Sequence, residues 1–270
     1  MSAEYSIADL RYLMSRLRDP QTGCPWDIKQ TYKTITPHTV EEAYEVVDAI
    51  ERGDIHHLSE ELGDLLFQII FYSQLGEEDN QFNFDGVVSQ ITGKLLRRHP
   101  HVFPDGTLQS VRDSDSVASE AEIKKNWETI KQQERSEVGT RGTLDDVPLA
   151  LPALSRAFKL QKRAANTGFD WSNISDVVDK VKEEIAELEV EIAKGDSQAM
   201  EEELGDLLFS CVNLARHLAI DPEKALALAS DKFKRRFQAM EAAVGQGRFA
   251  DLSLDEMELQ WIQAKGLESL

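Results

Sequence analysis

The chain carries one eight-residue segment twice, and this repeat constrains the fold more than any other feature of the sequence. Glu-Glu-Leu-Gly-Asp-Leu-Leu-Phe occupies residues 60–67 and again residues 202–209. A shift of 142 residues keeps the two copies in register without a gap over residues 41–67. A repeat of this length indicates two copies of one domain, because solenoid repeats are much shorter.

Each copy contains a Glu-x-x-Glu followed by a Glu-x-x-Asp. Residues three apart on a helix lie on one face. A Gly-Asp turn signal separates the two motifs and predicts a hairpin of antiparallel helices, which would bring the four acidic side chains together. The positions are Glu42, Glu45, Glu61 and Asp64 in the N-terminal copy, and Glu184, Glu187, Glu203 and Asp206 in the C-terminal copy.

These carboxylates predict a site for divalent metal ions. Four converging carboxylates repel one another unless cations lie between them. Ligands that are all oxygen suit Mg²⁺ or Mn²⁺ better than Zn²⁺. We therefore expect Mg²⁺, with Mn²⁺ as the alternative ion. The competing interpretation is an acidic surface that is only solvated, since Glu is a good helix former; the duplication favours the metal site.

Apolar residues accompany the carboxylates, so each acidic pair is expected to lie along the edge of a buried stripe. In the C-terminal copy this stripe comprises Ile185, Leu188, Ile192, Leu204, Leu207 and Leu208. Gly63 and Gly205 interrupt the helices at a cost on the order of 1 kcal/mol each relative to Ala. Either a close helix approach near the metal or an ordinary tight helix contact would explain these two glycines.

Helical periodicity covers most of the chain, and no segment shows the sustained alternation of a strand. We predict an all-α fold with essentially no sheet. One helix is expected over 39–52, with Thr39 as its N-cap and Glu42 completing a capping box. The other expected helices are 5–18, 57–76, 84–98, 120–135, 150–165, 174–194, 197–218, 222–243 and 254–265.

The repeat and the turn signals divide the chain into two tandem helical-bundle domains. The first is expected over residues 1–135. A linker over 136–149 contains Gly139, Gly142 and Pro148. The second domain is expected over 150–270, and it is the main catalytic candidate.

Composition excludes several classes of protein. The net charge of −19 argues against general nucleic-acid binding, which needs a basic surface. No apolar run approaches the roughly 20 residues that a membrane helix needs, and the N-terminus lacks the regions of a signal peptide. Cys24 and Cys211 have no metal-binding spacing, which is typical of a reduced, cytoplasmic protein.

A basic cluster stands out in this acidic chain at Lys232, Lys234, Arg235 and Arg236. Three of the four share a helix face and could bind the oxygens of a polyphosphate. The alternative is that they only offset the acidity of the protein, but a similar cluster at 94–98 favours a site. Lys180 and Lys182 are lesser candidates. Trp171 and Trp261 could stack on a nucleoside or belong to the core.

Several motifs together resemble the MazG family of nucleoside triphosphate pyrophosphohydrolases. They are the doubled acidic hairpin, Arg-Asp-Pro-Gln-Thr-Gly-Cys-Pro-Trp-Asp at 18–27, Arg-Arg-His-Pro-His-Val-Phe at 97–103 and Gly-Phe-Asp-Trp at 168–171. The resemblance covers nearly the whole chain. It implies a four-helix-type bundle in each repeat, a homodimer, and Mg²⁺-dependent hydrolysis of ribo- and deoxyribonucleoside triphosphates to monophosphate and pyrophosphate. It also implies broad base tolerance and a house-cleaning role in control of nucleotide pools.

The resemblance assigns roles to individual residues. Glu184, Glu187, Glu203 and Asp206 would be the catalytic metal ligands. The N-terminal copy keeps all four of its acids, so the division of labour stays open. The implied nucleotide-binding residues are Lys180, Val181, Lys182, Glu183, Glu201, Glu202, Lys232, Phe233, Lys234, Arg235, Arg236 and Trp261.

The expected reaction is an in-line displacement of pyrophosphate by water, with Glu183 or Glu202 as candidate bases. The chain contains no Gly-rich phosphate loop of the P-loop type. A di-iron bundle would need Glu-x-x-His motifs, which are missing. The alternative of a different class is a non-catalytic acidic adaptor that docks a partner protein.

Overall fold

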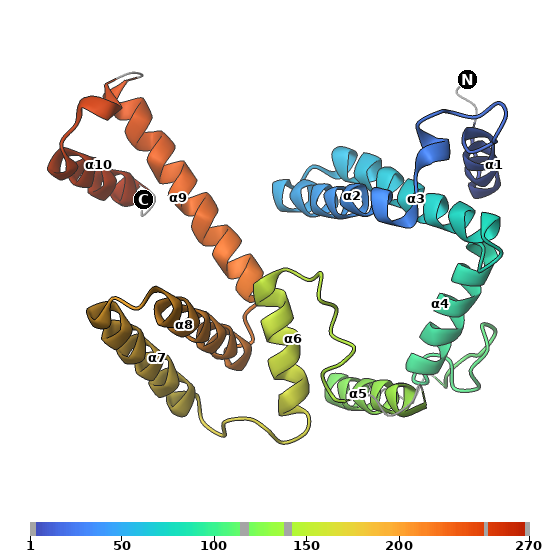
Figure 1. The fold of residues 1–270 in the computed structure, drawn as a ribbon. Coiled ribbons are helices and arrows are strands. Elements are labelled where there is room, and N and C mark those ends of the chain that lie inside the picture. Colours follow the sequence, from blue (N-terminus) through green and yellow to red (C-terminus); the bar gives the residue numbers. More distant parts are fainter. Residues whose placement is uncertain (1–3, 114–118, 138–141, 246–247, 268–270) are drawn as a thin grey trace. The chain divides into compact units, whose positions relative to one another are not determined.

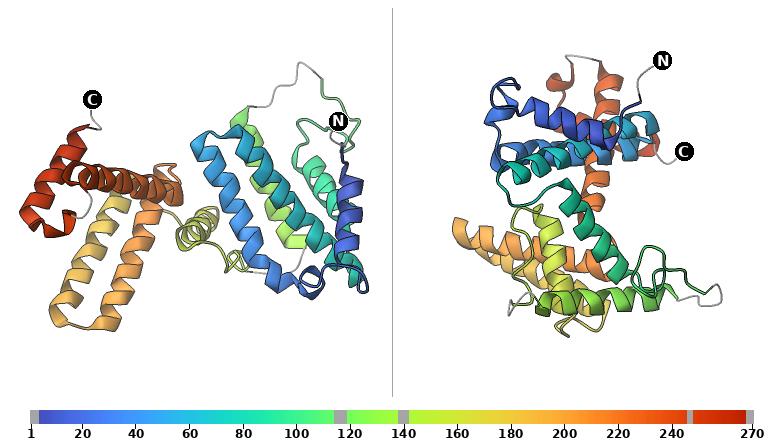
Figure 2. Two further views of the ribbon diagram at one scale, coloured as in Figure 1. Left: turned by 90° about the horizontal axis from the view of Figure 1, so that it is seen from above. Right: turned by 90° about the vertical axis from the view of Figure 1, so that its right-hand side faces the viewer.

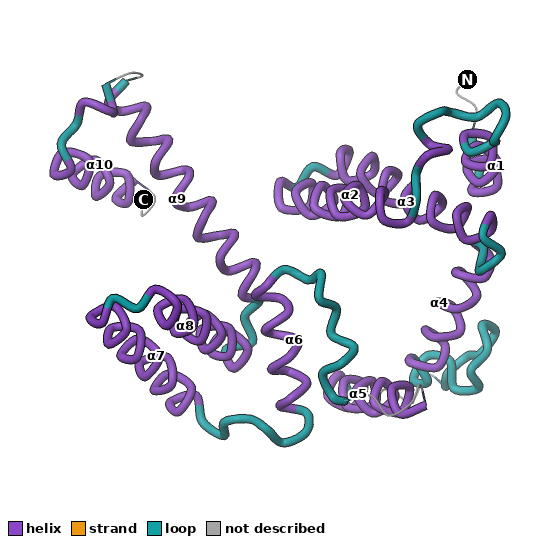
Figure 3. The backbone as a smooth tube through the Cα atoms, viewed as in Figure 1, coloured by secondary structure: helices purple, strands orange, loops and turns teal. Residues whose placement is uncertain are grey.

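The computed structural model describes residues 4–113, 119–137, 142–245 and 248–267. The described residues form helices and loops, with no strand among them, as Figure 3 shows. The predicted all-α class is therefore confirmed. The chain divides into two compact units, residues 1–134 and 135–270, and each is described by itself.

The first unit is built on a helical hairpin. Helices α2 (Tyr32–Arg52) and α3 (Ile55–Glu78) pack along each other, and α1 (Ile7–Leu17) and α4 (Phe84–Arg98) pack against α3 (Figure 1). A short 3₁₀ helix, η1 (Asp27–Lys29), precedes α2, and α5 (Glu120–Glu137) follows α4. The core cluster comprises Met14, Ile35, Ile70, Phe71 and Leu75.

The second unit repeats the hairpin. Helices α7 (Ile174–Lys194) and α8 (Ser197–His217) pack along each other, and α6 (Ala153–Ala165) contacts α8 and α9 (Pro222–Val244). After the 3₁₀ helix η2 (Phe249–Asp251), α10 (Leu254–Leu267) packs against α9. Both hairpins can be followed in Figure 2.

The Gly-Asp pairs close both hairpins, as the sequence predicted. Gly53 and Gly195 have φ angles of 70° and 75°, a left-handed conformation that glycine adopts without a steric penalty. The next residue, Asp54 or Asp196, caps the second helix by accepting a hydrogen bond from the backbone N–H three residues on. Two residues thus end one helix and begin the next.

The start predicted for α2 is wrong. The helix begins at Tyr32, because Thr31 and Thr34 form a reciprocal capping box there. Pro37 lies inside α2, only about one turn from its start, where it removes a single backbone donor. Thr39 is therefore no N-cap: its hydroxyl donates to a backbone carbonyl one turn earlier and lies 2.9 Å from the hydroxyl of Tyr72 on α3.

The prediction that the apolar stripe is buried is also wrong within a single chain. Leu188 and Leu207 are half-buried, whereas the other four apolar residues of the stripe are exposed by 44% to 57%: Ile185, Ile192, Leu204 and Leu208. A hairpin of two helices has one narrow contact face, and the buried Glu184 takes part of it. The rest of the apolar surface has no cover among the described residues.

Candidate metal and phosphate site

The α7–α8 hairpin brings three of the four predicted C-terminal ligands together. Glu184 and Glu187 on α7 and Glu203 on α8 each offer one oxygen, and these oxygens all lie within 4.8 Å of one another. Glu184 is buried, with 4% exposure, while Glu187 is exposed. Asp206, the fourth predicted ligand, is exposed and lies one turn beyond Glu203.

The electrostatics of this cluster are those of crowded anions. Burial raises the pKa of Glu203, and the charges of Glu187, Asp206 and Glu184 raise it further. Asp206 is thus close enough to act on the cluster electrostatically. A set of carboxylate oxygens at this separation, in which the charged form of Glu203 is disfavoured, fits a hard divalent cation such as Mg²⁺.

Lys180 is the cation nearest to the C-terminal cluster. Its Nζ lies 2.8 Å from carboxylate oxygens of both Glu183 and Glu184. Hydrogen bonds to these two carboxylates raise the pKa of Lys180, so it is charged at neutral pH. Lys182 instead pairs with Asp179 at 2.8 Å on the exposed side of α7.

Sequence reasoning missed Glu191. Its charge contributes to the raised pKa of Glu203, and it pairs with Lys194 at 2.6 Å. Glu191 lies four residues after Glu187, so a search for acids one turn from a proposed ligand would have found it. The candidate bases Glu183 and Glu202 are both exposed: Glu183 pairs with Lys180, and Glu202 accepts a hydrogen bond from Gln198.

The N-terminal hairpin holds an equivalent cluster. One oxygen from each of Glu42, Glu45 and Glu61 lies within 4.8 Å of the others. Burial raises the pKa of Glu42, and Asp64, Glu45 and Glu61 raise it further. Burial and Glu45 likewise raise the pKa of Glu61. Its three carboxylates fit a divalent cation by the same criterion as the C-terminal set.

The basic cluster of α9 lies beside aromatic residues. Phe233 stacks on Phe237, with ring centroids 6.0 Å apart, and its centroid is 5.4 Å from that of Trp261 on α10. The guanidinium of Arg236 lies 5.6 Å from the Trp261 centroid. The structure therefore brings Trp261 together with the predicted phosphate-binding helix. The charges that most strongly shift the pKa of Glu203 belong to α7 and α8, and no cation of α9 is among them.

The corresponding arginines of the N-terminal copy have an internal partner. Arg98 donates to Glu134 on α5 at 2.5 and 3.1 Å, and Arg97 donates to the same carboxylate at 3.4 Å. These arginines hold the pKa of Glu134 below its ordinary value. This pairing could not be predicted from local sequence patterns, because a long loop separates α4 from α5.

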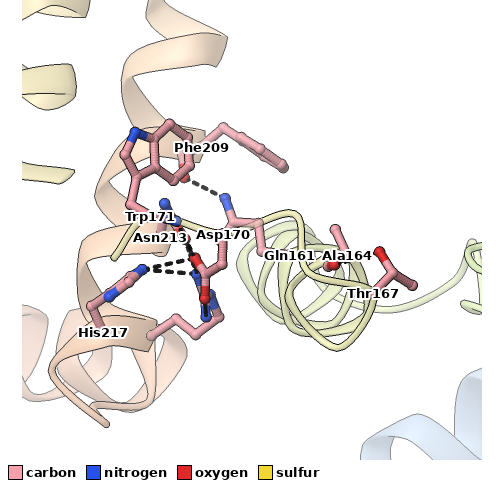
Figure 4. Close-up of polar contacts among 9 residues, drawn as sticks. Gln161, Ala164, Thr167, Asp170, Trp171, Phe209, Asn213 and His217 are labelled. Atoms are coloured by element: carbon pink, nitrogen blue, oxygen red, sulfur yellow. Dashed lines mark hydrogen bonds and ion pairs between the residues drawn. The ribbon is translucent and has the colours of Figure 1, made fainter. Parts of the chain in front are cut away.

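The Gly-Phe-Asp-Trp loop is anchored to the far end of α8, as Figure 4 shows. Arg216 donates to Asp170 and to Asn213, and His217 Nε2 lies 3.0 Å from Asp170. Hydrogen bonds from Arg216, partly offset by burial, lower the pKa of Asp170. The neighbouring Trp171 is 41% exposed. The motif therefore shapes the loop that leads into α7.

Gly63 and Gly205 meet neither of the two expectations made for them. A Cβ atom added at either position would find no atom within 4 Å. No close helix approach within the described chain explains them. Both glycines lie on the hairpin helices that carry Glu61 and Glu203.

Comparison with known proteins gives consistent matches. The MazG nucleotide pyrophosphohydrolase domain matches residues 30–103 and 173–240, one match over each hairpin. The nucleoside triphosphate pyrophosphohydrolase of Escherichia coli K12 is 48% identical over 97% of this chain and 98% of its own length.

Two further relatives span nearly the whole chain. The nucleoside triphosphate pyrophosphohydrolase/pyrophosphatase MazG of Thermotoga maritima is 39% identical over 96% of this chain and 95% of its own length. The uncharacterized protein YabN of Bacillus subtilis is 42% identical over 98% of this chain and 52% of its own length.

Proposed function

The chain belongs to the MazG family of nucleotide pyrophosphohydrolases, and from this premise we propose that it hydrolyses nucleoside triphosphates to nucleoside monophosphate and pyrophosphate. One observation carries the proposal: the hairpin that the family domain matches gathers the oxygens of Glu184, Glu187 and Glu203 within 4.8 Å. A solvated acidic surface would not need to bury Glu184.

The proposed metal ligands are Glu184, Glu187, Glu203 and Asp206, with Mg²⁺ as the ion and Mn²⁺ as its alternative. When bound, Mg²⁺ neutralises phosphate oxygens and stabilises the charge that develops on them. Buried Glu184 is held in place by its ion pair with Lys180. The lysine and arginine side chains of α9 would bind non-bridging oxygens of the triphosphate.

We propose a broad substrate range that includes ATP and both ribo- and deoxyribonucleotides. Many of the residues assigned to the nucleotide are cations, and one is the aromatic ring of Trp261. Such groups recognise phosphates and the faces of bases, which all nucleotides share, and not the edges that distinguish one base from another.

We also propose that the protein acts as a homodimer. Ile185, Leu204 and Leu208 are exposed on the hairpin by 44% to 51%, and Gly205 has open space beside it. Exposed apolar side chains that gather on one hairpin are typical of an interface. Light scattering after size exclusion should give a mass near twice the 30.4 kDa of one chain; a monomer would contradict this part of the proposal.

A panel of triphosphates incubated with and without Mg²⁺ tests the activity. We expect pyrophosphate and monophosphate only when Mg²⁺ is present. Orthophosphate with a diphosphate would mean that a different bond is cleaved, and the absence of any product would favour the acidic adaptor. The variant E203Q should lose turnover. If only the matched N-terminal variant E61Q did so, the assignment to the C-terminal copy would be wrong.

A further inference from the structure

The two copies share their carboxylates but differ at the positions beside them. His57 and Gln68 of the N-terminal copy correspond, in the register of the repeat, to Ala199 and Ser210 of the C-terminal copy. The N-terminal cluster therefore has an imidazole and an amide where the C-terminal cluster has a methyl group and a hydroxyl. These two differences change the chemistry of the donor atoms.

His57 places a nitrogen beside one carboxylate of the N-terminal cluster, while the oxygens that lie within 4.8 Å of one another are those of Glu42, Glu45 and Glu61. The Nε2 of His57 lies 3.1 Å from Oε1 of the buried Glu61, one turn further along α3. Two ligands at right angles on an ion with bonds of about 2.1 Å lie about 3 Å apart. The neighbouring His56 does not share this geometry, because its side chain is 88% exposed and pairs with the exposed Glu60.

Gln68 supplies an independent sign that a ligand belongs here. Its side chain is buried, with 6% exposure, and its Nε2 lies 3.5 Å from Oε1 of Glu42. Its Oε1 has no hydrogen-bond partner in the structure. A buried amide oxygen without a partner is costly and rare. The end of the amide that faces Glu42 is its nitrogen; when the two ends of the amide exchange places, the oxygen faces Glu42, and an ion between the two oxygens would satisfy it.

In the N-terminal copy, the arginines that correspond to the predicted phosphate-binding residues already pair with a carboxylate of the chain. Glu134 accepts hydrogen bonds from both Arg97 and Arg98. A triphosphate that used these arginines would first have to displace the carboxylate. The N-terminal copy thus offers metal ligands without an open arginine pair.

We propose that the N-terminal cluster is a site for a divalent transition metal, with Glu42, Glu45 and Glu61 joined by His57 Nε2 and Gln68 Oε1 as ligands. The C-terminal cluster, whose donors are carboxylates, takes Mg²⁺. Nitrogen ligands favour transition ions over Mg²⁺, which prefers oxygen. The inference rests on the proposed function in one respect, which is that the repeated carboxylates bind metal.

Electron paramagnetic resonance of free Mn²⁺ measures the binding directly. The full chain carrying E203Q, which weakens the C-terminal site, is titrated with Mn²⁺ in the presence of excess Mg²⁺. We expect one Mn²⁺ site that Mg²⁺ displaces poorly. Adding E61Q to this background should remove it, which assigns the site to the N-terminal cluster.

Three further changes in the E203Q background separate the ligands. H57A should weaken Mn²⁺ binding at least about tenfold while changing Mg²⁺ binding much less. Q68S, which introduces the residue of the C-terminal copy, should also weaken Mn²⁺ binding. H56A is the matched control and should bind Mn²⁺ like the parent. Circular dichroism checks that each variant is folded.

Three outcomes would overturn the proposal. They are no Mn²⁺ binding to the E203Q protein, equal binding by H57A and H56A, and an equal loss of Mg²⁺ and Mn²⁺ affinity in H57A. Pyrophosphate release by the unaltered protein with Mg²⁺ is measured in parallel. If that activity were missing while the Mn²⁺ results held, the proposed function would fail and the N-terminal site would stand.

Discussion

The Nζ of Lys180 lies 2.8 Å from Oε1 of Glu184, so a cation of the chain itself contacts the most buried carboxylate of the C-terminal cluster. A metal ion that uses Glu184 competes with this ammonium group for the same oxygen. Once a metal ion has displaced it from Glu184, the ammonium group of Lys180 can bind a phosphate oxygen of the substrate. Both roles can be separated by experiment.

The change K180M should tighten the binding of Mg²⁺ alone by a few-fold, because a competing positive charge is removed. It should raise KM for the triphosphate, because a donor to the phosphates is lost. Isothermal calorimetry with Mg²⁺ and steady-state kinetics measure the two effects. K182M is the control for the Mg²⁺ measurement, since Lys182 pairs with the exposed Asp179 and not with a carboxylate of the cluster. Equal effects of the two substitutions would refute the role given to Lys180.

The raised pKa of Glu203 predicts how the metal-free protein responds to pH. Its charged form is disfavoured in the folded state, so folding is destabilised once the pH rises through the folded pKa. In EDTA at pH 7, E203Q should therefore have a higher Tm than the parent. The difference should shrink as the pH falls through the pKa of Glu203, where the parent becomes protonated. An E203Q protein less stable than the parent at pH 7 would contradict the repulsion.

The ion pair between Asp170 and Arg216 should stabilise the loop before α7. D170N removes charge-assisted hydrogen bonds at a partly buried site, at a cost of about 1.5–3 kcal/mol. Because the pKa of Asp170 is lowered, this stabilisation is present at neutral pH and is lost as the pH falls through the folded pKa. Urea denaturation at several pH values measures it. D179N, which breaks an exposed ion pair, should cost less than about 1 kcal/mol.

Trp261 should stabilise the packing of α10 on α9. W261A removes a ring in contact with Phe233 and Arg236, and we expect a loss of about 2 kcal/mol. W261F should retain most of the stability. Thermal denaturation measures this effect, and KM measures any contact with the nucleotide. An unchanged Tm in W261A would show that the aromatic packing contributes little.

Local signals in the sequence predicted the hairpins and their carboxylates well. The Gly-Asp turns and the i, i+3 acids act within one or two helical turns; the structure closes both turns as expected and groups three of the four predicted acids of each copy. The predicted start of α2 failed because Thr39 and Glu42 also have the spacing of a capping box, whereas the helix begins earlier, at the box that Thr31 forms with Thr34.

Long-range pairings and the cover of apolar surfaces could not be predicted. Glu134 reaches Arg98 across a long loop, and no local pattern marks the pair. Periodicity identified the apolar face around Leu204, but it does not say whether the same chain covers that face. Those two questions depend on tertiary and quaternary packing.

The left-handed glycine between the hairpin helices also has a kinetic consequence. Because the paired helices are neighbours in sequence, their contacts are local, and such contacts form rapidly during folding. Closing the turn at Gly195 nevertheless brings like charges together, and their repulsion slows the formation of the hairpin. We expect divalent ions to assist the folding of newly made chains, since they favour the closed hairpin by mass action. Ion depletion should then delay the maturation of newly made chains.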